Sequence, residues 1–375
     1  MNSLIRCLNT NRRRAALSII LALTLVMTTI PTPVSAASKS SSRIKTYVFF
    51  GSDSRKNDDS WRSPNGGKIT QDKSGTEGIP RSDVIMLLKV DNKKKTIDLL
   101  SIYRDTLLDV SGKGTDFQVI NRAYSDLGPK KAVKVLEKNL DIKIDGYVAT
   151  NFKGVANVID ALGGVYINVE KEKTFPEVQK KYKLYNVVQT TNSYINEMNR
   201  IYNTKTPHIK KPGKQRLTGL QAVGYARVRY TEGSDRKRTV RQKTVLSSML
   251  SQYKASNAEV KAKALLALLD NVDTDINPAT LAVLFKKTAK YKIKKKQGFP
   301  YYIRAYTLKT KKERLGVATT LVPCDLTTNV KKLHKSFYGE KKYKPSKTVK
   351  KYSKKIVKKT KFTFSKRTKA CDNQY

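Results

Sequence analysis

The residues with the clearest chemistry lie in the stretch from Leu217 to Leu250. Its phosphate-binding candidates are Arg227, Arg229, Arg238, Arg241 and Gln242. Alternation from Tyr225 to Tyr230 predicts a strand, which would place the first two arginines on one face. The other three candidates are three and four residues apart on a following helix, so they share a side. Because arginine offers a permanently charged fork of donors, we predict a phosphate-binding cleft. A solvated face of a very basic protein is the alternative.

Three residues set the expected limits of these elements. Thr218 can cap a short helix that ends near Gly224, and Asp235 is the predicted N-cap of the later helix. That helix continues as a buried apolar stripe, formed by Val245, Leu246, Met249 and Leu250.

Two carboxylates are also placed where chemistry is expected. Asp53 and Asp83 each sit where a buried strand meets a loop, beside Arg55 and Arg81. Strand ends are the usual place for a site in an open α/β sheet. The two acids are either ordinary ion-pair partners or ligands of Mg²⁺, which takes few carboxylates and completes its shell with water and phosphate.

Strands and helices alternate along the chain that must position these residues. Strands are predicted at 47–50, 84–90, 96–102, 142–149, 165–169 and 301–307. Helices are predicted from Pro129, from Asn151, and at 262–269 and 278–289. The segment 170–213 has no clear period and is interpreted as an excursion over one edge of the sheet. The alternation predicts a layered α/β sandwich.

The charge and the N-terminus limit the surroundings in which the protein works. The 375 residues carry a formal net charge of +46, which implies polyanionic partners. Arg12–Arg14 precede an apolar run and a small-x-small site that ends at Ala36. We therefore interpret 1–36 as a signal peptide or an uncut signal-anchor, followed by a linker at 37–46. An extracytoplasmic location makes nucleic acid an unsuitable partner.

The C-terminal part is dominated by lysine. We interpret 331–375 as a basic tail, weakly ordered from Tyr343 onward, that would contact an anionic membrane or wall surface. Cys324 and Cys371 either close a disulfide across this region or remain two thiols.

Six short motifs occur in a fixed order along the chain. They are Gly51-Ser52-Asp53-Ser54-Arg55, Arg81-Ser82-Asp83, Ser101-Ile102-Tyr103-Arg104-Asp105, Ile120-Asn121-Arg122-Ala123-Tyr124, Asp160-Ala161-Leu162-Gly163-Gly164-Val165 and the stretch from Arg227 to Gln242. This series resembles the LytR-CpsA-Psr family of cell-wall enzymes over roughly Thr46 to Tyr253. The resemblance implies a three-layer α/β/α sandwich with a central mixed sheet, and a catalytic domain at 47–330.

The resemblance also implies an activity. Members are phosphotransferases that move an anionic glycopolymer, teichoic-acid-like or capsular, from a polyprenyl-pyrophosphate carrier to peptidoglycan on the outer face of the membrane. On that basis Asp53 and Asp83 correspond to Mg²⁺ ligands. The pyrophosphate clamp corresponds to Arg104, Arg227, Arg229, Arg238 and Gln242, with Arg55, Arg81 and Arg241 as further members. Asp235 corresponds to the acid that orients these arginines. Independently of the resemblance, the transfer chemistry calls for a carboxylate base near the acceptor hydroxyl, for which Asp83 and Asp105 are the candidates.

Two positions depart from the family pattern, and one other function class competes. Tyr103 stands where the family usually has proline, which affects how Arg104 is aimed; Arg122 adds charge near the polymer path.

The competing function is that of a non-catalytic secreted protein that adheres to polyanions in the cell wall. An enzyme with a lipid-linked donor further requires an apolar slot between the sheet and a helix layer.

Overall fold

The computed structural model describes residues 44–52, 81–229, 231–232, 234–288, 290–307, 319–366 and 368–369. The predicted signal segment 1–36 lies outside this part. Strand structure already begins at Ile44, inside the predicted linker, and Arg43–Tyr375 form one compact unit. Of the helices in the described ranges, none combines the length and the apolar character needed to cross a bilayer.

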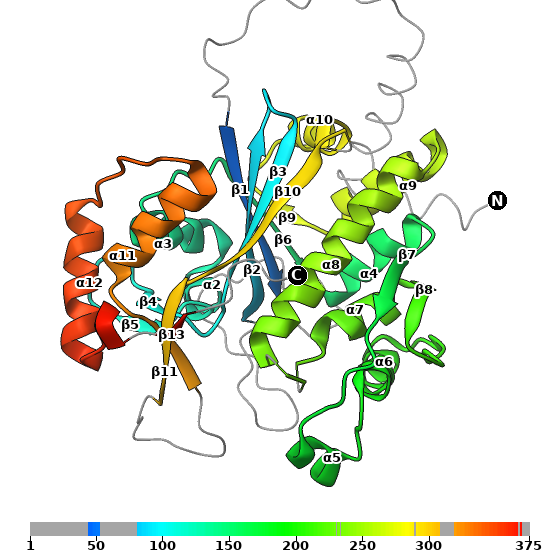
Figure 1. Cartoon of the computed structure of the whole chain (residues 1–375). Coiled ribbons are helices and arrows are strands. Elements are labelled where there is room, and N and C mark those ends of the chain that lie inside the picture. The colour runs from blue at the N-terminus through cyan, green and yellow to red at the C-terminus, as the bar shows by residue number, and fades with distance from the viewer. Residues whose placement is uncertain are drawn as a thin grey trace, which may run out of the picture. The chain divides into compact units, whose positions relative to one another are not determined.

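A six-stranded mixed sheet forms the centre of this unit (Figure 1). Its strands are, in spatial order, β10 (Lys292–Phe299), β3 (Thr96–Ile102), β2 (Ser82–Asp91), β1 (Ile44–Ser52), β6 (Gly146–Asn151) and β9 (Asp273–Thr274). β10 pairs with β3, and β1 with β6, in parallel; the other neighbours are antiparallel. The apolar run of β2 is largely buried, as expected for a strand covered on both faces.

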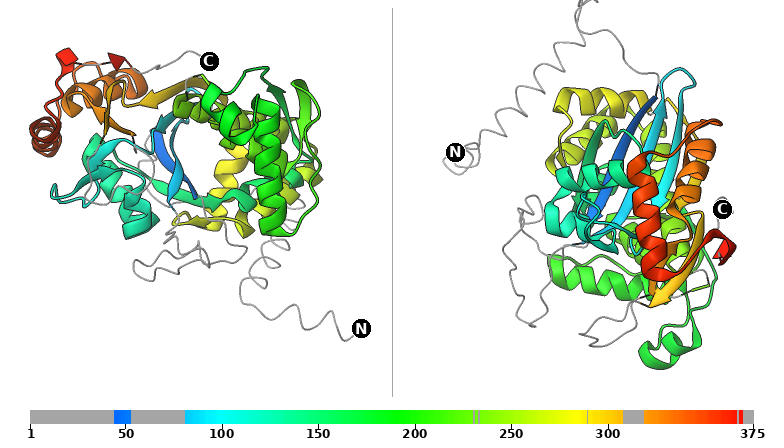
Figure 2. Two further views of the ribbon diagram at one scale, coloured as in Figure 1. Left: turned by 90° about the horizontal axis from the view of Figure 1, so that it is seen from below. Right: turned by 90° about the vertical axis from the view of Figure 1, so that its left-hand side faces the viewer.

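One face of the sheet is covered by helices from two distant parts of the chain. They are α2 (Arg122–Leu127), α3 (Pro129–Leu140), α11 (Leu326–Leu333) and α12 (Lys347–Thr360). Leu87 and Leu100 of the sheet share one buried cluster with Leu136, Val330 and Ile356 of these helices. The views in Figure 2 show this group on one side of the strands.

The opposite face is covered by a second group of helices. They are α4 (Phe152–Ala161), α7 (Gly219–Arg227), α8 (Ser234–Ala255), α9 (Ala258–Asp270) and α10 (Pro278–Thr288). Met86 and Leu99 of the sheet pack with Leu246 and Leu250 of α8. The prediction of a mixed central sheet with surrounding helices is therefore confirmed. The N-cap of α4 is also confirmed, because the Asn151 side chain accepts a hydrogen bond from the Gly154 amide.

Smaller elements complete the described ranges. They are β4 (Leu107–Asp109), β5 (Phe117–Val119), β7 (Val165–Val169), α5 (Pro176–Tyr182), α6 (Val187–Tyr202), β8 (Gly213–Leu217), β11 (Tyr302–Thr307), β12 (Thr319–Pro323), η3 (His334–Tyr338), η4 (Phe364–Lys366) and β13 (Thr368–Lys369). The segment 170–213 thus contains two helices that the sequence pattern did not reveal. In α6, Thr190 and Thr191 are buried and donate their hydroxyls to the carbonyls four residues earlier, so polar residues stand on the inner face.

The prediction of a weakly ordered tail from Tyr343 onward is wrong for 347–360. In α12, Val349, Tyr352 and Ile356 are 0–3 % exposed and belong to the main core. Their spacing of three and four residues puts them on one side of a helix whose other sides carry lysine. Cys324 is buried directly after β12, and Cys371 lies outside the described ranges, so their pairing stays open.

Candidate functional site

Arg227 is placed by a helix and not by the predicted strand. Thr218 and Gln221 form a capping box that starts α7, which confirms the cap, but the helix continues past Gly224 to Arg227. Gly224 is required for a different reason, because a Cβ there would lie 3.1 Å from the Thr191 carbonyl of α6. The glycine therefore permits close helix packing and does not end the helix.

The guanidinium of Arg227 is held on three sides. It lies 4.6 Å from the ring centroid of Phe152 and 4.4 Å from that of Tyr194, and its Nη2 donates to Glu197 Oε2 at 3.0 Å. These two cation–π contacts and the ion pair restrict the position of the guanidinium group. Arg227 is thus a pre-oriented donor on the wall of a cavity.

The cavity lies between the sheet and the second group of helices. It has a volume of about 260 Å³ and is lined almost entirely by apolar side chains. The predicted stripe of α8, Val245 to Leu250, forms part of its wall, and Leu281 and Phe285 belong to the same lining. Arg227 and Gln242 are the two lining residues with long polar side chains. The apolar slot that a lipid-linked donor requires is therefore present.

Four of the predicted site residues come together in a charged cluster at the ends of β2 and β3. Arg104 Nη1 lies 2.5 Å from Asp83 Oδ1, and its Nε lies 3.3 Å from Asp105 Oδ2. Arg238 of α8 places Nη1 3.5 Å from the other oxygen of Asp83. Val84, next to Asp83, and Gln242, one turn after Arg238, both line the apolar cavity. The charged cluster and the cavity therefore draw residues from the same two elements, β2 and α8, and are neighbours along both.

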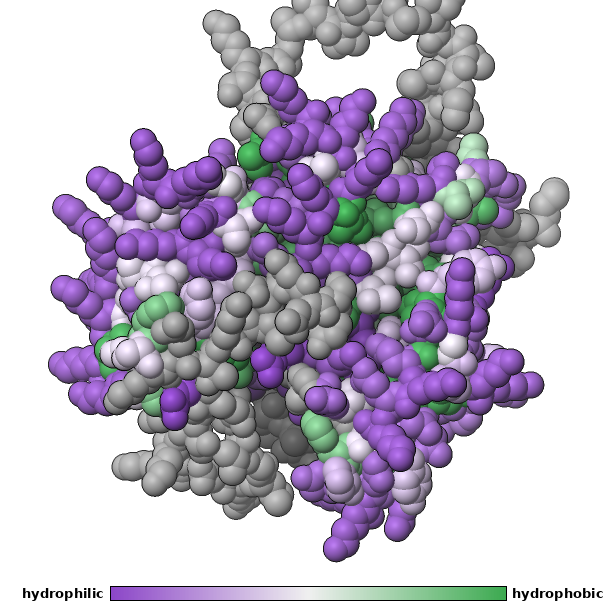
Figure 3. Space-filling model, in the orientation of Figure 1, coloured by the Kyte–Doolittle hydropathy of each residue, from purple (hydrophilic) through white to green (hydrophobic). Residues whose placement is uncertain are grey.

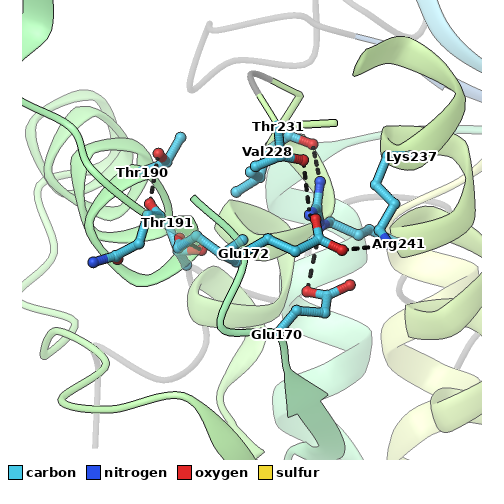
Figure 4. Close-up of polar contacts among 10 residues, drawn as sticks. Glu170, Glu172, Thr190, Thr191, Val228, Thr231, Lys237 and Arg241 are labelled. Carbon is cyan, nitrogen blue, oxygen red and sulfur yellow. Dashed lines mark hydrogen bonds and ion pairs between the residues drawn. The ribbon is translucent and has the colours of Figure 1, made fainter. Parts of the chain in front are cut away.

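Arg241 does not belong to this cluster, although it was assigned to the clamp. Its side chain is 0 % exposed and points to the loop between α7 and α8 (Figure 4). Nη1 donates to the Val228 carbonyl at 3.0 Å, and Nη2 donates to Thr231 Oγ1 at 3.1 Å and to Glu172 Oε2 at 2.9 Å. Its predicted place on the side shared with Arg238 and Gln242 is wrong, because carboxylates beyond β7 draw it away from the cavity.

Glu170 and Glu172 are the acids that hold Arg241. The Nε of Arg241 lies 3.5 Å from Glu170 Oε2, and Lys237 Nζ lies 2.5 Å from Glu172 Oε1. The charge of Arg241 is thereby balanced inside the fold, which leaves it a structural role rather than a phosphate contact.

The remaining predicted residues fall into two groups. Asp53 and Arg55 lie outside the described residues, although Ser52 at the end of β1 pairs with Ser82 beside Asp83. Arg81 is exposed just before β2, and Arg229 is half-buried in the loop after α7. α8 begins at Ser234, so Asp235 lies within the first turn and is not the N-cap.

The donors near Asp83 suit a hard cation. Among the described residues no group of three or more His, Cys, Asp or Glu side chains could hold a metal. The hydroxyl of Ser82 and the side-chain oxygen of Asn121 are buried and make no hydrogen bond in this part of the chain. The backbone N–H of Asn121 donates to the Arg104 carbonyl, and Ser82 directly precedes Asp83. Both oxygens therefore lie near the strand ends that carry Asp83 and Arg104. One carboxylate with neutral oxygens fits Mg²⁺, whose shell is completed by water and phosphate.

Several residues that shape the site carried no recognisable sequence signal. Phe152, Tyr194 and Glu197 surround Arg227, and they come from α4 and α6. Tyr194 and Glu197 are three residues apart, a spacing that would have indicated a shared helix face if 187–202 had been recognised as a helix. Tyr103 is buried against Gly298 of β10 and donates its amide to the Phe299 carbonyl. This explains how the strand before Arg104 is fixed without the usual proline.

Known proteins with the same arrangement identify the chain's relatives. The polyisoprenyl-teichoic acid–peptidoglycan teichoic acid transferase TagU of Halalkalibacterium halodurans is 33 % identical over 198 residues, which are 52 % of this chain and 55 % of TagU. The chain spans about half the length of the curated relatives it matches. A crystal structure of B. subtilis TagV is similar in fold, with a TM-score of 0.53 and 24 % identity over 81 % of this chain and 99 % of that one.

A third neighbour is a TagT structure described as having a bound octaprenyl pyrophosphate lipid. It has a TM-score of 0.50 and 19 % identity, and covers 80 % of this chain and 93 % of that one. At such identities these two structures establish a shared fold. The model of the LytR_cpsA_psr family matches residues 28–322, which is more than half of the sequence. The chain belongs to the LytR_cpsA_psr family.

Proposed function

We propose that this protein is an extracytoplasmic phosphotransferase, which moves an anionic glycopolymer from a polyprenyl-pyrophosphate carrier to peptidoglycan. The observation that carries the proposal is that an apolar cavity and a cluster of arginines are built on the same two elements, β2 and α8. A lipid-linked pyrophosphate has the same two parts, a long apolar chain and a compact group of negative charge. A protein that only adheres to polyanions has no use for an apolar cavity of about 260 Å³.

The carrier's lipid would occupy the space between β1, β2 and α8. There the side chains of Met86, Val245 and Leu250 would replace water around the isoprenoid chain. Arg227 and Gln242 would then meet the first polar atoms of the donor. The apolar wall favours one orientation, because the pyrophosphate cannot enter the cavity without losing its hydration.

The charged cluster would bind the pyrophosphate itself. Arg104 and Arg238 are held by Asp83, so their guanidinium groups are oriented before the donor arrives. Pre-oriented donors stabilise the charge that develops on the phosphate oxygens during transfer and need no reorganisation at that moment. Mg²⁺, held by Asp83 with Asp53, would supply further neutralisation of that charge.

The transfer step needs a base for the acceptor. A sugar hydroxyl of peptidoglycan attacks the phosphorus atom that carries the polymer, a new P–O bond forms, and the bond to the bridging oxygen breaks. Polyprenyl phosphate leaves with that oxygen, and the hydroxyl proton passes to a carboxylate. Asp83 has both oxygens on guanidinium groups and a 17 % exposed side chain, whereas the side chain of Asp105 is 29 % exposed. We therefore assign the base role to Asp105.

A direct test is the mass of the lipid that the full-length protein retains. Extraction of the purified protein should yield a polyprenyl phosphate or pyrophosphate. Met249→Trp, which fills the cavity, should reduce its amount roughly tenfold. The matched control is Val283→Trp, on α10 and 49 % exposed, which should change nothing. Retention of equal lipid by all three proteins would contradict the assignment of the cavity.

A further inference from the structure

A second recess, lined by lysine, runs along the outer edge of the sheet. We call it the β10 groove. It has a volume of about 620 Å³ and is lined by Ile293, Lys294, Lys295, Lys296, Gln297, Lys332, Lys335 and Ser336. β10 is the edge strand, and α11 with η3 forms the other wall. None of the described residues that line it is acidic. Figure 3 shows how strongly hydrophilic side chains dominate this side of the molecule.

The two walls of the β10 groove are joined by hydrogen bonds, one of which comes from a lysine. Lys295 Nζ donates to the Ser336 carbonyl at 2.5 Å, which joins β10 to η3. Gln297 Oε1 accepts from Tyr301 Oη at 2.8 Å, and Ser336 Oγ donates to the same hydroxyl at 3.0 Å. These bonds fix the distance between the two walls. A row of like charges along walls whose spacing is fixed is a site that attracts an anion.

A buried positive charge contacts the backbone of Gln297, one of the residues that line the β10 groove. Lys243 of α8 is 8 % exposed, and its Nζ donates to the Gln297 carbonyl at 3.2 Å. Within the described residues it forms no salt bridge, whereas the buried Lys89 lies 2.7 Å from Asp98. Burial, and next the charge of Lys296, lower the pKa of Lys243 to about 8. An anion in the groove would relieve this repulsion.

The β10 groove leads toward the charged cluster of the proposed active site. β10 runs parallel to β3, with Gln297 level with Leu100. Arg104 follows Leu100 by four residues, two residues beyond the end of β3, so it lies within roughly 13 Å of Leu100 in the direction of the strand. The Phe299 carbonyl accepts from the Tyr103 amide at 3.0 Å, so the end of the groove and the segment before Arg104 are joined directly.

We propose that the β10 groove binds phosphate groups of the polymer that the donor carries, at a distance from the pyrophosphate. This inference rests on the proposed function. A recess between two walls fits a linear chain, whereas a flat membrane surface would contact projecting lysines. Phosphate groups spaced along one chain would meet successive lysines of β10 and η3. The groove would thus favour donors with a long anionic polymer over donors with a short head group.

The binding test uses poly(glycerol phosphate) without lipid as the probe and the full-length protein. Lys294→Gln/Lys332→Gln/Lys335→Gln removes three charges from the β10 groove. The matched control Lys130→Gln/Lys131→Gln/Lys354→Gln removes three exposed charges from α3 and α12. We expect the groove variant to bind the polymer roughly tenfold more weakly at low salt, and the control to change less than about twofold. Equal losses in the two variants would overturn the proposal.

Two further arms separate the possible sources of phosphate and the two proposals. Binding to phosphatidylglycerol vesicles should fall equally in the groove and control variants; a selective loss in the groove variant, with polymer binding intact, would assign the groove to lipid. In transfer assays, the groove variant should have a higher KM for a donor that bears the polymer. Its KM for a donor with a short head group should be unchanged. If neither donor is turned over by the wild type, the proposed function fails, while the binding arm still decides the groove.

Discussion

Arg241 Nη1 donates to the Val228 carbonyl at 3.0 Å, and this bond joins the middle of α8 to the chain that leaves α7. The same guanidinium reaches Thr231 at 3.1 Å, so it holds both sides of the segment that contains Arg229. A fully buried arginine therefore holds the loop that carries the half-buried Arg229, which we propose as a member of the phosphate clamp. It acts through Arg229 and is a positioning residue.

Replacing Arg241 by Lys should lower both stability and turnover. The ammonium cannot make the bonds to Val228, Thr231 and the two glutamates together, and the free energy of unfolding should fall by about 2–4 kcal/mol. Because the loop then loosens, kcat/KM should fall roughly tenfold or more, even at a temperature where the variant is fully folded. Denaturant unfolding and transfer assays measure the two effects. Arg200→Lys on the exposed side of α6 is the control, and an equally small effect in both would contradict the positioning role.

Replacing Arg227 by Lys should reduce transfer much more than it reduces stability. The substitution removes the guanidinium group that contacts the rings of Phe152 and Tyr194. Its forked donors are lost with it, although the positive charge remains. We expect roughly a hundredfold lower kcat/KM, equivalent to about 3 kcal/mol, with the unfolding free energy changed by less than about 1 kcal/mol. Near-normal activity in this variant would show that a point charge is enough.

Asp83→Asn tests the metal and the ion pairs separately. The change keeps the shape of the side chain but removes the charge that faces Arg104 and Arg238, so transfer should fall roughly a hundredfold. Chelator should remove the activity of the wild type, and added Mg²⁺ should restore it. A Mg²⁺ titration followed by thermal unfolding should show weaker binding in the variant. An unchanged titration with lost activity would leave Asp83 as an ion-pair partner only.

The sequence predicts the central strands because their apolar runs have a short, clear pattern. β3 begins and ends where alternation and the flanking turn predicted it. The side chain of Arg241 could not be placed in this way, because helical spacing gives only the side of the helix. Its partners Glu170 and Glu172 are about seventy residues away, in a segment whose helices were not recognised.

Lysine-rich elements were missed for a different reason. β10 is an edge strand, and its pairing with β3 stabilises it although four of its eight residues are lysine. In α12 the apolar stripe was present at the correct spacing, but the surrounding lysines suggested a solvated tail. The prediction therefore gave more weight to the lysine-rich composition than to the local apolar periodicity. The periodicity was the correct indicator of structure.

Lys243 should make stability depend on pH. Its pKa is lowered from 10.5 to about 8 in the folded state, so the unfolded state binds more protons between these values and stability rises with pH across this window. Below pH 8 the buried charge costs up to about 3 kcal/mol. Lys243→Met should therefore be more stable than the wild type at pH 7, and its advantage should disappear toward pH 10.5. Unfolding curves across this range measure the difference, with the exposed Lys294→Met as a control that should show no such trend.

Removing the chain after Lys342 should unfold the protein, contrary to what a dispensable tail would predict. The truncation deletes Val349, Tyr352 and Ile356, whose burial contributes about 1.5–3 kcal/mol for each side chain. It also deletes Tyr343, whose ring stacks on His334 with a centroid distance of 3.5 Å. The summed loss is comparable to the whole stability of a typical domain, about 5–15 kcal/mol.

A shorter truncation and a pair of point variants decide whether α12 itself is responsible. A chain that ends after Lys366 keeps α12 and lacks Cys371, and it should remain folded and active. In the full-length protein, Tyr352→Ala should lower the unfolding free energy by about 3–5 kcal/mol, because a ring that packs edge-on against Phe117 leaves a cavity. Lys354→Ala on the exposed side of the same helix should change it by less than about 0.5 kcal/mol. If the chain that ends after Lys342 kept a cooperative unfolding transition and its turnover, α12 would be an accessory to the core and not part of it.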